Sequence, residues 1–339
     1  MERDSPSTTP PRSAQERRVE HREHRRPRPG VGVTAPRTDH RDRYLERIAE
    51  VRAGTSAEKV GYPIHVREAT VVRTAMVGSG LLRVTLGRPG TEGFQAHAPD
   101  EHVKLLFPGE DGVLRLPERD GLMLRWPKPL PTSREYTVRR YDPATGELDI
   151  DVALHAGGLG SEWAAAARPG DTVHVAGPPG GLIVPHNYDR YVLAGDITAL
   201  PALARWLEEL PRDAAGWAFI EVAGPDEEIA LDAPANVEVR WLHRGDVPPG
   251  VGTALADAVR EVVVPEGERA YVWVAGEAGS IKPLRRWVRD ELGLGKKDHD
   301  ITGYWKRGVE DFDDDHEHEH GHDHEHDHEH EHGDEHDDH

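Results

Sequence analysis

Two hydrophobic patterns follow each other along this chain and meet near residue 188. Between residues 65 and 183, short Val- and Thr-rich runs alternate with Gly- and Pro-rich turns, which is typical of a small antiparallel barrel or sandwich. From residue 190 onward, strand-like runs alternate with helical patterns, which indicates a parallel sheet with helices between its strands. The sequence therefore predicts a β barrel followed by an α/β domain, with ligands at the carboxyl ends of the parallel strands.

The same patterns predict the individual elements. The expected barrel strands are 65–77, 81–86, 101–107, 121–125, 134–139 and 147–154. The expected sheet strands are 190–194, 218–222, 237–242 and 270–275, with helices over 199–210, 253–263 and 278–292. A further helix over 41–53 should place Leu45, Ile48 and Val51 on one face.

We therefore divide the chain into four parts. They are a disordered basic arm with a short helix (1–60), the barrel domain (61–187), the α/β domain (188–310) and a disordered His/Asp/Glu-rich tail (311–339). The formal charge of -20 is spread unevenly, because residues 1–43 carry a net +4 and residues 311–339 a net -15. The acidic body gives no reason to expect a nucleic-acid partner.

The chain contains no cysteine, which excludes disulfides, cysteine-ligated iron–sulfur clusters and a thiol nucleophile. The N-terminus has no apolar segment of the kind that secretory signals carry. No apolar run approaches the roughly 20 residues that a membrane span needs. We therefore expect a cytoplasmic protein without stable membrane insertion.

The first candidate binding segment is the strand 134–139, Arg-Glu-Tyr-Thr-Val-Arg. Alternation along a strand puts Arg134, Tyr136 and Val138 on one side, and Thr137 and Arg139 on the other. An aromatic ring beside a hydroxyl and a guanidinium suits a flat ring joined to a pyrophosphate. The alternative is an ordinary edge strand with solvated arginines.

A glycine-rich turn follows about twenty residues later, from His155 to Gly160, and leads into a helix predicted over 161–167 with Ser161 as its N-cap. The amides at such a helix start form an anion site. A hairpin between the two segments would bring this turn to Tyr136. The alternative is a simple loop. The α/β half lacks a Gly-x-Gly-x-x-Gly fingerprint, so a flavodoxin-like sheet without a cofactor is the alternative there.

Taken together, the motifs resemble those of the siderophore-interacting proteins, which are FAD-dependent ferric-siderophore reductases of the ferredoxin–NADP reductase-like superfamily. The motifs that carry the resemblance are the segments 101–108, 134–139, 155–163, 170–178, 195–201, 241–244, 275–277 and 303–308. They span residues 65–308 in the family's order. The turn 156–160 departs from the family by being shorter.

The resemblance implies a specific set of site residues. FAD would be bound by Arg134, Tyr136, Thr137, Val138, His155, Gly160, Ser161, Asp196, Thr198 and Ala199. Tyr136, Glu277 and Trp305 would lie at the flavin face and serve catalysis. A ferric siderophore is often anionic, and Lys282, Arg285 and Lys306 would bind it. A solvated helix face is the alternative for the basic residues 282–286. Electrons would come from NAD(P)H or a small ferredoxin-like carrier.

The tail alternates His with Asp and Glu, and such a segment can bind Ni, Zn, Co or Fe. Its expected metal ligands are His316, His318, His320, His322, His324, His326, His328, His330 and His332. The tail could accept Fe(II) from the reductase, sequester an unrelated metal, or only solubilise the chain.

The sequence thus predicts a flavin-dependent reductase that passes electrons from NAD(P)H through FAD to the Fe(III) of a siderophore. One alternative is a general NAD(P)H–flavin or quinone reductase on the same fold. Another is a non-enzymatic metal-buffering protein that acts through its tail.

Overall fold

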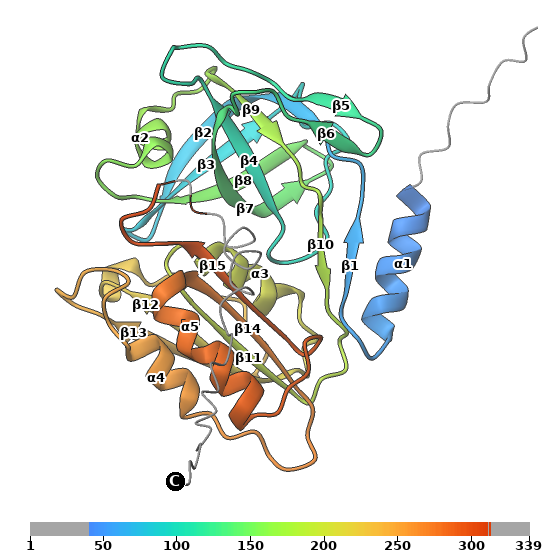
Figure 1. Cartoon of the computed structure of the whole chain (residues 1–339), viewed down its shortest axis with the longest axis vertical. Coiled ribbons are helices and arrows are strands. Elements are labelled where there is room, and N and C mark those ends of the chain that lie inside the picture. Colours follow the sequence, from blue (N-terminus) through green and yellow to red (C-terminus); the bar gives the residue numbers. More distant parts are fainter. Residues whose placement is uncertain (1–40, 311, 313–339) are drawn as a thin grey trace, which may run out of the picture. The chain divides into compact units, whose positions relative to one another are not determined.

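The computed structural model describes residues 41–310 and 312, and these form a closed barrel followed by a parallel sheet (Figure 1). The predicted order of a β barrel and an α/β domain is therefore confirmed. The arm predicted over residues 1–40 and the tail beyond Phe312 lie outside the described residues. The predicted boundary at residues 187 and 188 falls in the connection between the last ribbon strand and the first sheet strand.

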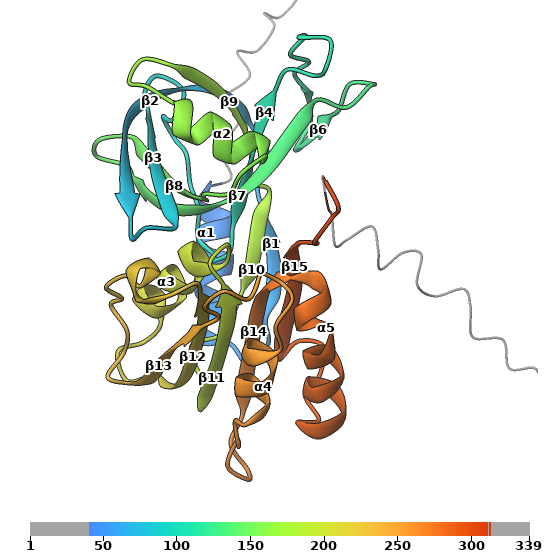
Figure 2. The ribbon, with the colours of Figure 1, turned by 90° about the vertical axis from the view of Figure 1, so that its left-hand side faces the viewer.

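Six antiparallel strands close the barrel in the order β2-β3-β8-β7-β4-β9. Their bounds are β2 Val66–Val77, β3 Leu81–Gly87, β4 His102–Phe107, β7 Thr132–Asp142, β8 Glu147–Ala153 and β9 Thr172–Ala176. Alternate side chains such as Val84, Leu105 and Ile150 point inward and are fully buried. Helix α2 (Leu159–Ala166), between β8 and β9, adds Ala164 to this core (Figure 2).

A two-stranded ribbon of β1 (Glu58–Gly61) and β10 (Gly180–Ile183) connects the barrel to the sheet. Helix α1 (Arg41–Ala53) packs on it through Ile48 and Val51, as predicted. The prediction for Leu45 is wrong, because this side chain is 39% exposed and Tyr44 takes its place against the core. The spacing 44, 48, 51 follows one helical face more closely than 45, 48, 51 does.

The strand predicted over 121–125 is also corrected. It is the second arm of a hairpin formed by β5 (Glu118–Asp120) and β6 (Met123–Arg125), and Gly121 lies in the turn with φ of 64°. A positive φ suits glycine because it has no Cβ. The hairpin belongs to the excursion between β4 and β7.

The second half is a five-stranded, fully parallel sheet in the order β13-β12-β11-β14-β15. Its strands are β11 Arg190–Asp196, β12 Ala215–Val222, β13 Asn236–His243, β14 Ala270–Glu277 and β15 His299–Trp305. The sequence analysis did not identify β15 as a strand, because its Asp, Gly and polar residues break the apolar pattern. The strand conformation of β15 is stabilised by its pairing with the buried strand β14 and not by its local sequence.

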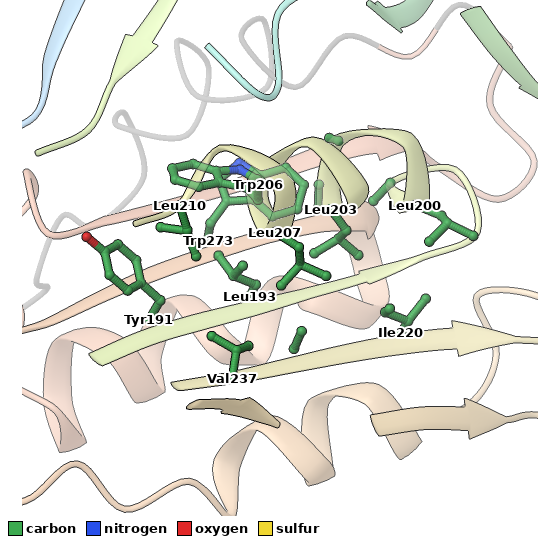
Figure 3. Packing of buried hydrophobic residues seen from close by; sticks show 14 of the residues in the cluster. Tyr191, Leu193, Leu200, Leu203, Trp206, Leu207, Leu210, Ile220, Val237 and Trp273 are labelled. Atoms are coloured by element: carbon green, nitrogen blue, oxygen red, sulfur yellow. The ribbon is translucent and has the colours of Figure 1, made fainter. Parts of the chain in front are cut away.

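Both faces of the sheet are covered, which is why β11 and β14 are almost wholly apolar. Tyr191 and Leu193 face α3 (Leu200–Glu209), whereas Val192 and Ala194 face the opposite side. That side carries α4 (Ala254–Arg260) and α5 (Ala278–Arg286), as Figure 2 shows. Figure 3 shows the α3 side, where Trp206 and Leu207 pack over Tyr191, Leu193 and Trp273.

The three helices of the α/β domain, α3, α4 and α5, are shorter than predicted. Helix α5 ends at Arg286 and continues as a wider π turn over Trp287–Glu291, and a single 3-10 turn, Pro225–Glu227, connects β12 to β13. Among the described helices, none combines the length and apolar character that crossing a bilayer requires.

A half-buried acid lies where the barrel meets the sheet. Asp100, just before β4, accepts a hydrogen bond of 3.3 Å from the indole Nε1 of Trp273 on β14. Burial raises the pKa of Asp100 to about 7, and the nearby carboxylate of Asp300 adds to the rise. The charged form of Asp100 is therefore unfavourable in the folded protein at neutral pH.

This gives a pH-dependent prediction. The pKa of Asp100 is higher in the folded than in the unfolded chain, so protonation of Asp100 favours the folded state at low pH. This contribution to the free energy of unfolding is lost as the pH rises from about 4 to about 7. Asp100→Asn keeps an acceptor for Trp273 without the charge. We expect it to raise the free energy of unfolding by about 1–2 kcal/mol at pH 8 and to change little at pH 4. Denaturant unfolding beside the exposed control Asp246→Asn tests this, and an equal effect at both pH values would contradict it.

Candidate functional site

Tyr136 and the glycine-rich turn lie against each other. A Cβ atom built on Gly160 would come within 1.7 Å of the Tyr136 hydroxyl oxygen, so the phenol rests directly on that glycine. Only a residue without a side chain allows this approach. The prediction that the strand 134–139 and the turn meet is therefore confirmed.

The start of helix α2 is built without a side-chain cap. Gly158 is at the N-cap position and no side chain accepts the helix-start amides there. The prediction of Ser161 as N-cap is wrong, because the helix begins at Leu159 and the Ser161 hydroxyl accepts the amide of His155 at 2.9 Å. First-turn amides have no acceptor within their own helix. They can therefore bind an anion beside Tyr136.

His155 covers the turn that precedes this helix. Its exposed ring lies over Gly158, where a Cβ atom would come within 2.1 Å of the ring carbon Cε1. Gly157 has a φ of 75°, which reverses the chain beneath the ring. The histidine therefore shapes the turn and leaves one side of its ring open to solvent.

The four predicted residues of β7 are in different environments. Arg134 is half-buried and donates to the carbonyl of Ser133 at 2.7 Å. Burial raises the pKa of Tyr136 to about 12, against the opposing charge of Arg134, so its phenol stays protonated at neutral pH. Val138 is fully buried in the barrel core. It supports the strand and offers no side-chain surface to a ligand.

A second cluster joins the carboxyl ends of three sheet strands. Asp196 at the end of β11 accepts the amide of Glu277 on β14 at 3.0 Å and the indole Nε1 of Trp305 on β15 at 2.8 Å. Its other oxygen accepts the amide of Thr198 at 2.9 Å. Burial raises the pKa of Asp196, and the hydrogen bonds from Thr198 and Trp305 oppose that rise. The structure thus brings together four predicted site residues, Asp196, Thr198, Glu277 and Trp305.

This cluster lies at the point where the strand order reverses. β11 and β14 are neighbours in the sheet, and their helices α3 and α4 cover opposite faces. In open α/β sheets, ligands bind outside the strand ends at such a reversal. The location therefore fits a nucleotide approaching Asp196, Glu277 and Trp305.

Glu277 caps helix α5. Its carboxylate accepts the amide of Ser280 at 2.7 Å and the amide of Arg307 at 3.1 Å. Burial alone would raise the pKa of Glu277, but these amides outweigh it and keep the pKa below its usual value. Glu277 is therefore an ionised carboxylate at neutral pH that ties the segment after β15 to the helix. The usual N-cap residues are Ser, Thr, Asp and Asn, so the local pattern does not indicate Glu277 as a cap.

Gly250 is a residue that the sequence analysis missed. A Cβ atom there would come within 2.5 Å of Glu277 Cγ and 3.1 Å of Trp305 Cη2, so the loop after β13 packs onto the cluster. The pair Pro249-Gly250 marks a turn, but nothing local indicates what the turn touches. Ala199 is also fully buried, and its amide donates to the carbonyl of Asp196 at 3.0 Å.

The three predicted substrate residues come from two segments, α5 and the end of β15. Lys282 is exposed on α5, and Arg285 donates to the carbonyl of Ile301 at 3.1 Å, five residues before Lys306. Lys306 lies beyond Trp305 with its Nζ 5.7 Å from the ring centre of Phe312. The predicted metal ligands from His316 to His332 lie outside the described residues.

The Tyr136–Gly160 contact predicts the effect of a single methyl group. We expect Gly160→Ala to weaken FAD binding to the apoprotein by about 10-fold or more, because the phenol must move. Adding Tyr136→Phe should recover part of this loss, since the nearest remaining ring atom, Cζ, would be 2.9 Å from the new Cβ. Flavin fluorescence quenching measures the affinity. The control is Gly252→Ala, whose Cβ would meet its nearest neighbour at 3.8 Å. Equal affinities of Gly160→Ala and wild type would contradict the prediction.

Comparisons with known proteins match both halves of the chain. Residues 70–182 match the model of the siderophore-interacting FAD-binding domain, and residues 188–308 match that of siderophore-interacting protein. The ferric vibriobactin reductase ViuB of Vibrio cholerae is 35% identical over 248 residues, which cover 72% of this chain and 91% of ViuB. The NADPH-dependent ferric-chelate reductase of Escherichia coli is 32% identical, covering 68% of this chain and 89% of that protein.

Solved structures agree with the sequence relatives. A siderophore utilization protein from T. fusca has a TM-score of 0.72 and 40% identity, covering 76% of this chain and 99% of that one. The siderophore-interacting protein SipS from Aeromonas hydrophila has a TM-score of 0.62 and 29% identity, covering 76% of this chain and 96% of that one. With its barrel, its second domain and their order all matched, this chain belongs to the siderophore-interacting protein family of FAD-dependent oxidoreductases.

Proposed function

We propose that this protein reduces ferric siderophores with electrons from NAD(P)H, using FAD bound on the barrel. The observation that supports the proposal is the proximity of two groups of residues. One is Tyr136 with its glycine-rich turn, and the other is the cluster of Asp196, Glu277 and Trp305. Burial raises the pKa of Tyr304, and the side chain of Thr137 opposes the rise, so these two residues are neighbours. Thr137 follows Tyr136 and Tyr304 precedes Trp305. The flavin strand and the nucleotide edge of the sheet therefore meet side by side.

The residues of the barrel fit a flavin. The aromatic face of Tyr136 would pack on a flat ring, and the uncapped amides of α2 with Arg134 would bind the diphosphate. When bound, FAD accepts a hydride and passes its electrons on singly, which a two-electron donor and a one-electron metal require. Tyr136 would face the flavin as a protonated phenol, because burial raises its pKa to about 12.

The sheet residues position the reductant. Asp196 and Glu277 fix the ends of β11, β14 and β15, so Trp305 has one orientation at the edge where the nicotinamide approaches. One NAD(P)H supplies two electrons and reduces two Fe(III) ions, giving NAD(P)⁺, one proton and two Fe(II). Oxygen-donor siderophores bind Fe(II) less tightly, and the metal then leaves. We expect NAD(P)H rather than a ferredoxin-like carrier as donor, and the cytoplasm, which supplies it, as the location.

Lys306 is the proposed contact with an anionic substrate. It is half-buried and lies next to Trp305 in the chain. We expect Lys306→Met to raise KM for an anionic ferric catecholate by about 3- to 10-fold with little change in kcat. Stopped-flow and steady-state reduction assays measure both constants, with the exposed Lys296→Met as control. Reduction of a neutral quinone at rates above those of every ferric complex would instead identify a quinone reductase.

We also propose that the tail binds the released metal. Residues 313–339 contain eleven histidines and no Lys or Arg. The chain enters this segment beside the site, because Phe312 packs on Gly303, where a Cβ atom would come within 2.9 Å of its ring. Imidazole and carboxylate groups bind divalent metals in the Irving–Williams order.

Deletion of residues 313–339 tests this proposal. We expect the truncated protein to lose most of its bound Ni²⁺, Zn²⁺ and Fe²⁺ while keeping its ferric reductase activity in the presence of an external Fe(II) chelator. Metal content after dialysis and calorimetric titration with each ion measure the loss. Unchanged metal binding after truncation would show that the tail is not the binding segment.

A further inference from the structure

A buried arginine connects the second domain to the flavin strand. Arg205 on α3 is 6% exposed, and among residues 43–310 and 312 it is the only Lys or Arg that is buried. Its Nη1 donates to the carbonyl of Val138 on β7 at 2.9 Å, and its Nε donates to Glu209 at 2.8 Å. The sequence analysis did not single out this residue, because an arginine on an amphipathic helix usually faces solvent.

The bond from Arg205 falls at an irregularity of β7. Val138 pairs with Ile150 of β8, but Arg140 pairs with the adjacent Asp149, so Arg139 is an extra residue in the strand. A bulge of this kind leaves backbone groups outside the ladder and redirects side chains. The amide of Val138 donates to the carbonyl of Glu101 at 2.8 Å. Arg205 thus satisfies the carbonyl of the residue at which the bulge begins.

The extra residue is bound by the same helix. The guanidinium of Arg139 makes two hydrogen bonds to Glu208 of α3, at 2.9 and 2.5 Å. Consecutive residues of the flavin strand therefore each contact α3, one through its backbone and one through its side chain. Tyr136 and Thr137 immediately precede this segment, so its conformation determines where their side chains lie.

Burying the charges of Arg205 and its neighbour Glu101 costs free energy. Glu101 is 1% exposed, and its carboxylate accepts the amides of His97 at 2.9 Å and Ala98 at 3.1 Å. Burial raises the pKa of Glu101, and the positive charge of Arg205 opposes this rise. Buried ionic groups are often no more stabilising than apolar residues of the same volume. The hydrogen bonds of Arg205 and Glu101 are directional, so these residues are better suited to fixing the position of β7 than to adding stability.

We propose that Arg205 is a positioning residue for the flavin. By binding the Val138 carbonyl at the bulge, it fixes β7 so that Tyr136 lies on Gly160 and Thr137 lies beside Tyr304. The inference rests on the proposed flavin site. It adds that flavin affinity and reduction potential depend on a residue of the second domain that the flavin itself does not touch.

The experiment compares apoproteins of wild type, Arg205→Met and Arg205→Lys. The control is Arg212→Met, which removes an exposed arginine of the same domain that pairs with Asp232 at 2.9 Å. We expect Arg205→Met to weaken FAD binding by about 10-fold or more and to change the visible flavin spectrum and midpoint potential. Arg205→Lys should recover part of the affinity, because it keeps one charged donor, and the control should match wild type.

A second variant covers the case in which Arg205→Met does not fold. Glu208→Gln removes the charge that pairs with Arg139 at the helix surface, and we expect the same direction of change, by about 2- to 3-fold. Lower unfolding stability of Arg205→Met with wild-type affinity, spectrum and potential would overturn the inference and leave Arg205 a purely structural residue. Failure of the wild-type apoprotein itself to bind FAD would instead refute the proposed flavin site.

Discussion

The buried carboxylate of Asp196 joins the ends of three parallel strands, and the geometry of the nucleotide edge depends on it. It accepts a backbone amide from β14 and an indole N–H from β15, while its second oxygen orders the turn into α3. A buried carboxylate is tolerated only when its oxygens are hydrogen-bonded. The same bonds that make the charge tolerable therefore set the spacing of Glu277 and Trp305 at the point where the strand order reverses.

The barrel places an aromatic ring beside free backbone amides. Gly160 lets the Tyr136 phenol approach the start of α2, and Gly158 leaves the first-turn amides without a side-chain cap. Glycines here cost conformational entropy. These glycines create an anion site in contact with an aromatic surface. A flavin with its diphosphate needs this combination.

The two halves share an apolar cluster, in which Leu81 of β3 packs with Leu200 and Leu203 of α3, and polar and charged groups add directional bonds across the junction. Arg205 and Glu208 of α3 meet the bulge in β7, and Asp100 meets Trp273. Directional bonds of this kind define a relative position more sharply than apolar packing does. Electron transfer between a nucleotide on one half and a flavin on the other depends on that position, which gives a physical reason for burying charge there.

Local pattern was enough to predict the barrel, the α/β half and most strands, because alternation and glycine-rich turns act over a few residues. It also predicted that Tyr136 meets the turn that ends at Gly160, whereas Asp196 and Glu277 were implied by the resemblance to the family. It could not assign β15, the Val138–Arg140 bulge or the N-cap at Gly158. Each of these depends on a neighbour distant in sequence.

The sequence by itself determined which segments become strands and helices and which residue types are available for a flavin and a nucleotide. Only the tertiary structure decided that Arg285 is bonded to the backbone carbonyl of Ile301, and that Arg205 is buried against Val138. The physical reason is that secondary structure follows local periodicity. The partner of a charged side chain, in contrast, is set by the packing of elements that are far apart in the chain.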